Sequence, residues 1–261
     1  MSFRLFLMVT AVVTAAAVGL AVAVPSGSAD AATTGLWAGW GTTGPKSFTV
    51  QVASTPPMAA TVTTDSRQGQ IGVISGTSVW LAAGTPPGAK YGSSQGHPYL
   101  NLRPKADTPT APSTTTYSFA APTPTSGWAF VLGDIDADQV TVRAVGPNGV
   151  PLTTAQLGYR GGFNYCAPGI PAKPSCTGDP DDIPTWNPAT QTLVGNAEGI
   201  DTSGSAGWFE PSAPITSLTF HLRPAQRLPR LPDLVRLPRP QPDRDGHGVL
   251  RLPRRLDRHS P

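Results

Sequence analysis

The stretch from Gly127 to Ala144 constrains the fold more than any other part of the chain. Its larger apolar side chains recur at every second position on either side of an acidic interval: Trp128, Phe130 and Leu132, then Val140, Val142 and Ala144. A spacing of two places one set of side chains on one face of a β-strand. The stretch therefore predicts a strand, an acidic turn and a second strand in the core of a β-sandwich.

The rest of the chain repeats this strand pattern and lacks sustained helical periodicity. With 28 Gly, 30 Pro and only 13% charged residues, the composition favours short strands joined by irregular loops. We predict an all-β fold, a jelly-roll-like β-sandwich over residues 33–222. A hairpin is expected around Gly76-Thr77, and a loop-rich region from Gly84 to Thr114. Further strands are expected at Ser47–Ala53, Thr115–Ala120, Thr192–Asn196 and Ile215–Leu222.

The first 32 residues have the features of a signal peptide. Arg4 precedes an apolar run from Leu5 to Val24, Pro25 interrupts it, and Ala29-Asp30-Ala31 supplies small residues for cleavage after Ala31 or Ala32. The alternative is an uncleaved membrane anchor, because the run is nearly long enough to span a bilayer. After cleavage we expect a secreted protein with no membrane contact, associated with the cell wall if the full-length product carries an anchor.

The net positive charge of the chain comes from its C-terminal tail. Residues 33–222 carry eleven acids and eight bases, whereas residues 223–261 carry ten Arg and four Asp. The basic pI therefore gives no reason to expect nucleic-acid binding by the domain. The tail, rich in Arg and Pro, is predicted to be disordered.

Cys166 and Cys176 are the only cysteines. In an exported chain, one close pair favours a disulfide that pins the loop up to Pro184. Metal binding would need more ligands than this segment offers.

Several short motifs recur in order between Tyr117 and Leu222: Tyr117-Ser-Phe119, Gly127–Asp138, Gly162–Cys166, Thr185–Thr190, Leu193–Asn196, and Asp201–Gly204 with Gly207-Trp-Phe209. Together they resemble the N-terminal domain of secreted actinobacterial cell-surface proteins. That domain often precedes prealbumin-like or carboxypeptidase-regulatory-like β-sandwich repeats. The resemblance implies a non-catalytic, adhesive domain.

In the family the pattern would continue after Phe220 with a further aromatic strand, which this chain lacks. Codons exist for Gln226–Leu237 that, read one base later, encode Ser-Gly-Phe-Pro-Val-Tyr-Gln-Thr-Trp-Phe-Ala. We therefore predict that residues 223–261 are a frameshift product. The alternative is a genuine Pro/Arg-rich tail that binds an acidic surface.

Asp134, Asp136 and Asp138 suggest a calcium site, because hard cations take carboxylate oxygens at alternate positions. The calcium loop of an EF-hand would need Gly and Glu where Gln139 and Val145 stand. The alternative is that these acids cap a turn by accepting backbone hydrogen bonds. A weaker acidic cluster comprises Asp179, Asp181 and Asp182.

Gly92-Ser-Ser-Gln-Gly96 matches the G-x-S-x-G motif that presents a nucleophile in hydrolases. The prolines around it disfavour the helix that should follow, and within the domain His221 is the candidate base for Ser94, on a predicted strand. A secreted hydrolase is therefore the least favoured function.

Trp186 and Trp208 fall in predicted loops and are the better candidates among six tryptophans for stacking on sugar rings. Packing against the core is the competing role. We expect a non-enzymatic structural or adhesive domain whose partner is an extracellular glycan or surface protein, with a carbohydrate-binding module as the alternative. No cofactor other than calcium is suggested.

Overall fold

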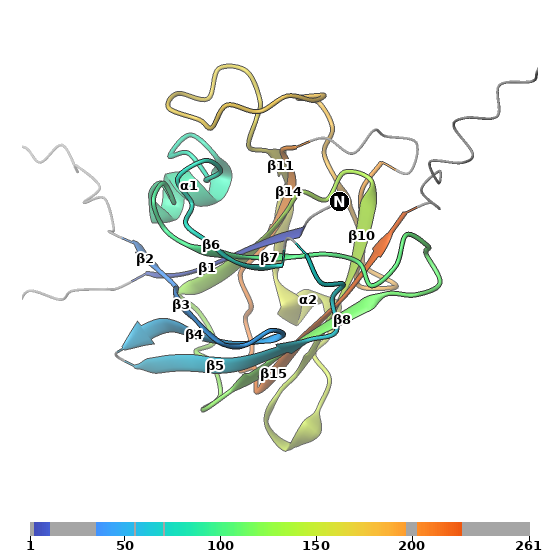
Figure 1. The fold of residues 1–261 in the computed structure, drawn as a ribbon. Coiled ribbons are helices and arrows are strands. Elements are labelled where there is room, and N and C mark those ends of the chain that lie inside the picture. The colour runs from blue at the N-terminus through green and yellow to red at the C-terminus, as the bar shows by residue number, and fades with distance from the viewer. Residues whose placement is uncertain (1–2, 11–34, 55, 70, 197–202, 226–261) are drawn as a thin grey trace, which may run out of the picture. The chain divides into compact units, whose positions relative to one another are not determined.

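The computed structural model describes residues 3–10, 35–54, 56–69, 71–196 and 203–225, which belong to one compact unit (Figure 1). The predicted cleavage site and residues 226–261 of the predicted tail lie outside the described residues, whereas residues 223–225 of that tail are described, and the first two of them continue the last strand of the sandwich. Within the described residues, no helix is both long enough and apolar enough to cross a membrane.

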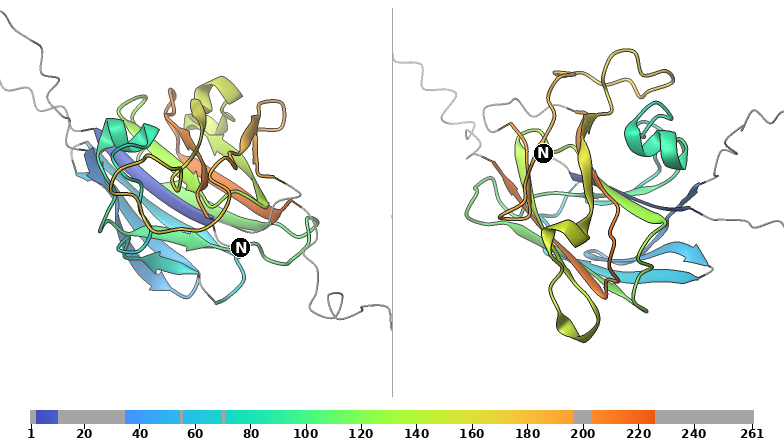
Figure 2. Two further views of the ribbon diagram at one scale, coloured as in Figure 1. Left: turned by 90° about the horizontal axis from the view of Figure 1, so that it is seen from above. Right: turned by 180° about the vertical axis from the view of Figure 1, so that it is seen from behind.

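The described residues form two antiparallel sheets packed face to face, which confirms the predicted β-sandwich (Figures 1 and 2). The first sheet has the order β11-β14-β9-β1-β7-β6, and β2 pairs with β1. Its strands are β11 (Tyr159–Asn164), β14 (Ser205–Phe209), β9 (Trp128–Gly133), β1 (Phe3–Thr10), β7 (Tyr99–Leu102), β6 (Gly72–Ile74) and β2 (Gly35–Trp37).

The second sheet has the order β12-β13-β10-β15-β8-β5-β4-β3. Its strands are β12 (Thr185–Asn187), β13 (Thr192–Val194), β10 (Asp138–Val145), β15 (Ser217–Pro224), β8 (Ser113–Phe119), β5 (Pro57–Thr64), β4 (Ser47–Ser54) and β3 (Gly39–Gly44). The predicted strands beginning near residues 47, 115, 192 and 215 are thereby confirmed.

The predicted strand, acidic turn and strand are β9, residues 134–137 and β10. The turn carries the chain from the first sheet to the second, so the two strands do not pair with each other. Phe130 on β9 stacks on Phe209 at 4.8 Å between ring centroids and meets the edge of Phe220, from the second sheet, at 5.7 Å. These rings join the two sheets at the centre of the core.

The first sheet is covered on both faces. All six residues of β9 are buried: Trp128, Phe130 and Leu132 face the core between the sheets, whereas Ala129 and Val131 belong to a second apolar cluster. That outer cluster includes Leu81, Tyr91 and Tyr165 and therefore draws on the segments that precede and follow the central strands. Because both faces are buried, β9 has a nearly continuous apolar sequence.

One local prediction is wrong. Residues 78–82 do not pair with the strand before Gly76; instead β6 pairs with β7. The region from Gly84 to Thr114 contains β7 and a short helix, α1 (Pro86–Tyr91). The Thr85 side chain accepts a hydrogen bond from the Gly88 N–H, and proline stands at the start of the helix, where its missing N–H leaves no partner unsatisfied.

The segment between β10 and β11 contains two more short elements. A 3₁₀ turn at Pro147–Gly149 has positive φ at Asn148 (63°) and Gly149 (76°), as the Asn-Gly pair predicts. Helix α2 (Thr154–Leu157) begins with a reciprocal capping box between Thr153 and Gln156.

The predicted signal peptide includes a strand of the sandwich. β1 lies between β9 and β7 in the first sheet, and Leu5, Phe6, Leu7 and Met8 are at most 1% exposed. Alternation alone does not reveal this strand, because an apolar run buried on both faces has no period of two.

Candidate functional site

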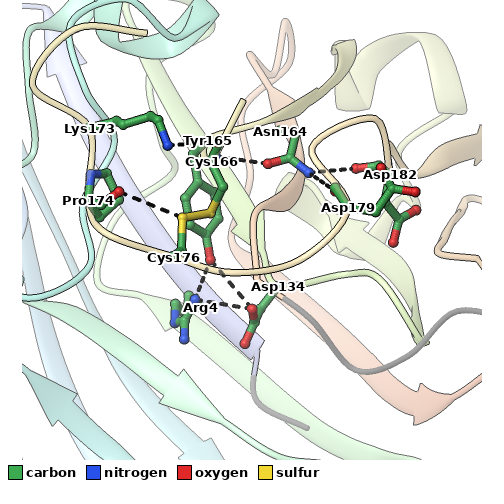
Figure 3. Close-up of a disulfide and its surroundings, with 10 residues drawn as sticks. All are labelled: Arg4, Asp134, Asn164, Tyr165, Cys166, Lys173, Pro174, Cys176, Asp179 and Asp182. Atoms are coloured by element: carbon green, nitrogen blue, oxygen red, sulfur yellow. Dashed lines mark hydrogen bonds and ion pairs between the residues drawn. A yellow bond between two sulfur atoms is a disulfide. The ribbon is translucent and has the colours of Figure 1, made fainter. Parts of the chain in front are cut away.

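The acidic turn after β9 is held by an ion pair and hydrogen bonds (Figure 3). The Arg4 Nη1 donates to Asp134 Oδ1 at 3.1 Å and also to the Tyr165 hydroxyl. Asp134 is only 5% exposed and has a φ of 68°, a backbone conformation that Asp tolerates better than most residues. Burial, and then the negative charge of Asp134, raise the pKa of Tyr165, so this hydroxyl stays protonated.

The other two acids of the triplet are fully buried. Asp136 accepts a hydrogen bond from the Ala137 N–H at 2.8 Å. This is the turn-capping role that the sequence offers as the alternative to calcium binding. Asp138 is the first residue of β10. Among the described residues, no group of three or more His, Cys, Asp or Glu side chains is placed to hold a metal ion. Calcium binding at this turn remains a prediction.

The predicted disulfide is present: Cys166 and Cys176 are bonded, with their Cα atoms 6.0 Å apart. The Asn164 amide donates to the carbonyls of Asp179 and Asp182, both at 3.0 Å, and so holds the far end of the loop to β11 (Figure 3). Burial, and then the charge of Asp179, raise the pKa of Asp182. These acids thus belong to a loop fixed by a disulfide and by main-chain hydrogen bonds.

The structure does not bring the candidate nucleophile and its candidate base together. Ser94 is fully buried, and its Oγ accepts a hydrogen bond from the Leu81 N–H at 2.7 Å. Helix α1 precedes Ser94 rather than following it. His221 lies on β15 of the second sheet, where its Nδ1 is 3.2 Å from the Thr114 hydroxyl. Ser94 therefore supports a loop, and nothing in its contacts activates it as a nucleophile.

The prediction that both candidate tryptophans fall in loops is wrong: Trp186 lies on β12 of the second sheet and Trp208 on β14 of the first. Trp186, on β12, stacks on Tyr159 at 5.4 Å and meets the edge of Phe209 at 5.1 Å. Trp208 is the neighbour of Phe209 on β14 and packs against the outer cluster instead. Because the two rings pack against different apolar clusters, they cannot form one shared stacking platform. Both side chains are half-buried. Sugar binding at either residue remains a prediction.

A hollow of about 480 Å³ lies beside Trp186, and we call it the Trp186 hollow. Two aromatic rings, Trp186 and Tyr159, line it together with the charged pair of Arg160 and Glu210. The Arg160 Nε lies 2.8 Å from Glu210 Oε2. The remaining lining residues are Thr154, Ala155, Gly158, Pro188 and Ser212.

Glu210 is the most constrained side chain of the Trp186 hollow. Its Oε1 accepts hydrogen bonds from the Lys90 ammonium and the Tyr91 hydroxyl, each at 2.5 Å. Burial alone would raise the pKa of Glu210, but the bonds from Lys90 and Tyr91 and the nearby positive charges outweigh it and lower the pKa. Glu210 is therefore ionised at neutral pH and accepts hydrogen bonds without donating any.

Sequence reasoning identified Trp186 but missed Tyr159, Arg160 and Glu210. These residues come from β11 and from the end of β14, so no spacing in the sequence links them. A second hollow, of about 770 Å³, lies over β3, β4, β5 and β8, with Trp40 and Phe119 in its lining. The Trp40 Nε1 is buried without a hydrogen-bond partner.

The chain matches no family model, no curated protein and no solved structure. The resemblance to actinobacterial surface domains remains a prediction.

Proposed function

We propose that the chain is an exported, non-catalytic β-sandwich domain that has a structural or adhesive role at the cell surface. The observation that carries this proposal is the Cys166–Cys176 disulfide. Disulfides of this structural kind persist in oxidising compartments and are rare in the cytosol of mesophiles. The apolar run and small-residue cleavage site of residues 1–32 support the same compartment.

The uses of the polar side chains support a non-catalytic role. Ser94 fixes the main chain at Leu81, and His221 joins β15 to β8 through Thr114. Each of these groups holds one part of the sandwich to another. A serine-hydrolase site would instead hold its nucleophile within hydrogen-bond reach of its base.

Expression with the native leader in a secreting bacterium tests the proposal. We expect the protein in the extracellular or cell-wall fraction, with neither cysteine alkylated unless a reductant is added. A panel of ester and glycoside substrates should show no turnover. Recovery of the protein only in the cytosol with two free thiols, or turnover abolished by Ser94→Ala, would contradict the proposal.

A carbohydrate-binding role is the second candidate, and the Trp186 hollow favours it. An aromatic ring offers a face on which a sugar can stack, and the neighbouring Glu210 and Arg160 supply an acceptor and donors for hydroxyl groups. Their existing mutual contacts fix the orientation of both groups before any ligand arrives.

Matched variants separate this role from packing. Trp186→Ala should abolish retention on a polysaccharide that the wild-type chain binds, whereas Trp208→Ala, beside the outer cluster, should leave retention unchanged. Circular dichroism would confirm that both variants fold. Equal loss of retention in the two variants would show that the Trp186 hollow is not the binding site.

A further inference from the structure

The strand at the centre of the first sheet belongs to the segment that export would remove. β1 pairs with β9 from Arg4 opposite Gly133 to Val9 opposite Trp128. On its other side it pairs with β7, with Phe3 opposite Leu102 and Leu5 opposite Leu100. Figures 1 and 2 show β1 (dark blue) alongside the green β9. Cleavage after Ala31 or Ala32 would leave a slot between β7 and β9, which we call the β1 slot.

The β1 slot is apolar on both of its faces. Leu5 and Leu7 point into the core between the sheets, where Phe130 and Leu132 also lie. Phe6 and Met8 point to the outer cluster with Tyr99 and Tyr165, and the Phe6 ring lies 4.9 Å from that of Tyr99. A strand that fits the slot must therefore carry apolar side chains on both faces.

The main chain of β9 adds a second requirement. Six consecutive residue pairs join β9 to β1, so removal of β1 leaves the hydrogen-bonding groups on this edge of β9 without their strand partner. Buried N–H and C=O groups without partners are strongly unfavourable, and an open strand edge pairs readily with another extended chain. The slot thus favours an extended strand over a helix or a small molecule.

Charge marks one end of the β1 slot. Arg4 enters beside the acidic turn, where its guanidinium meets Asp134 and the Tyr165 hydroxyl. Its side chain is 14% exposed and that of Asp134 is 6% exposed. An occupant with Arg or Lys at this position would restore the buried ion pair, whereas an acidic residue there would be repelled.

The residues that follow β15 begin near this same turn, because the Ala225 N–H donates to the Ala137 carbonyl. Their sequence nevertheless does not suit the slot. No stretch of eight residues is free of proline between Gln226 and Pro242, and the proline-free residues 243–252 include Asp243, Arg244, Asp245 and Arg251, so they are not apolar on both faces. A central strand needs its N–H groups on both sides, and proline has none.

We propose that, in the exported protein, the β1 slot is an acceptor site for an extended strand of another polypeptide chain. The strand runs in the direction of β1, is apolar on both faces and carries Arg or Lys at the position of Arg4. Strand addition of this kind takes affinity from main-chain hydrogen bonds and specificity from the side-chain pockets. The inference rests on the proposed export, because the slot opens only when the leader is removed.

The test adds a strand to the exported chain. The probe is a fluorescent synthetic peptide of residues 2–10, with solubilising lysines after Thr10. We expect one peptide to bind per chain and to slow amide hydrogen exchange in β9 and β7 by about tenfold or more. Peptides with Arg4→Glu or with Leu7→Asp should bind at least about tenfold more weakly, because they disturb the ion pair or the core face.

Three outcomes would overturn the proposal. The first is failure of the exported chain to take up the peptide. The second is equal binding of the wild-type and Leu7→Asp peptides. The third is full protection of the β9 amides before any peptide is added, since other residues of the exported chain would then fill the slot. If the exported chain is unfolded alone, folding that depends on the peptide supports the proposal.

A second experiment tests the β1 slot independently of export. If the leader is retained, a protease site placed between residues 11 and 34 allows β1 to be cut from the full chain in vitro. Exchange of the cut β1 for labelled peptide would support an acceptor slot even though the export proposal had failed. No exchange after complete cutting would overturn the slot as well.

Discussion

The disulfide offers the clearest quantitative prediction. Replacing both Cys166 and Cys176 by Ser removes a cross-link that closes a loop with a sequence separation of 10. In the chain-entropy account, releasing a loop of this length lowers the free energy of unfolding by about 2.7 kcal/mol. For a domain of this size, each kcal/mol corresponds to about 2–4 °C in melting temperature, so we expect a fall of roughly 5–11 °C.

The assay is urea and thermal unfolding, followed by circular dichroism, of the disulfide-bonded full chain and the double variant. A reductant should lower the stability of the wild-type protein to that of the variant and leave the variant unchanged. Ser175→Ala is the matched control: this exposed residue adjoins Cys176, and its replacement should change stability by at most about 0.5 kcal/mol. A loss below about 1 kcal/mol in the double variant would refute the reasoning, because the cross-link would then not restrict the unfolded chain as the chain-entropy account requires.

Three further predictions concern titration, calcium and the reading frame. Burial, and then the charge of Arg143, lower the pKa of His221 below 6.5; its contribution to stability is present above pH 6.5 and is lost as pH falls through the folded-state pKa. Between about pH 7.5 and about pH 5.5, the free energy of unfolding measured in urea should therefore fall less in His221→Gln than in the wild type. Equal falls in the two proteins would contradict this. The predicted calcium site requires a melting temperature several degrees higher in calcium than in chelator, and equal melting temperatures would show that the acidic turn is not a site. Resequencing the coding DNA from the codon of Leu218 should show that the reading frame shifted by one base encodes the aromatic strand. An immediate stop codon in that frame would show that the Arg/Pro tail is genuine.

Alternation predicted the strands whose two faces differ in burial. β4, β8 and β15 each alternate between buried and less buried residues, so the period of two is visible in the sequence. Helix α1 also had a local signal, Thr85 followed by Pro86 and Pro87, but the same residues are typical of turns. Strand alternation and helix-start residues can be predicted from sequence because each of these patterns depends on a single element.

The Trp186 hollow and the pairing of β1 depend on contacts between distant segments. Glu210 meets Lys90 across 120 residues, and Arg4 meets Asp134 across 130. No spacing rule links such residues in a single sequence. The apolar run after Arg4 fits both a leader and a strand buried on both faces, because each needs a row of apolar side chains and lacks a period of two.

The N-terminal residue of the exported protein tests the account most directly. Expression with the native leader, followed by mass spectrometry of the intact extracellular protein, gives this residue and the state of both cysteines together. We predict a chain that begins at Ala32 or Thr33, carries the Cys166–Cys176 disulfide and lacks β1. An extracellular chain that still contains residues 3–10, or a chain found only in the cytosol, would contradict the account.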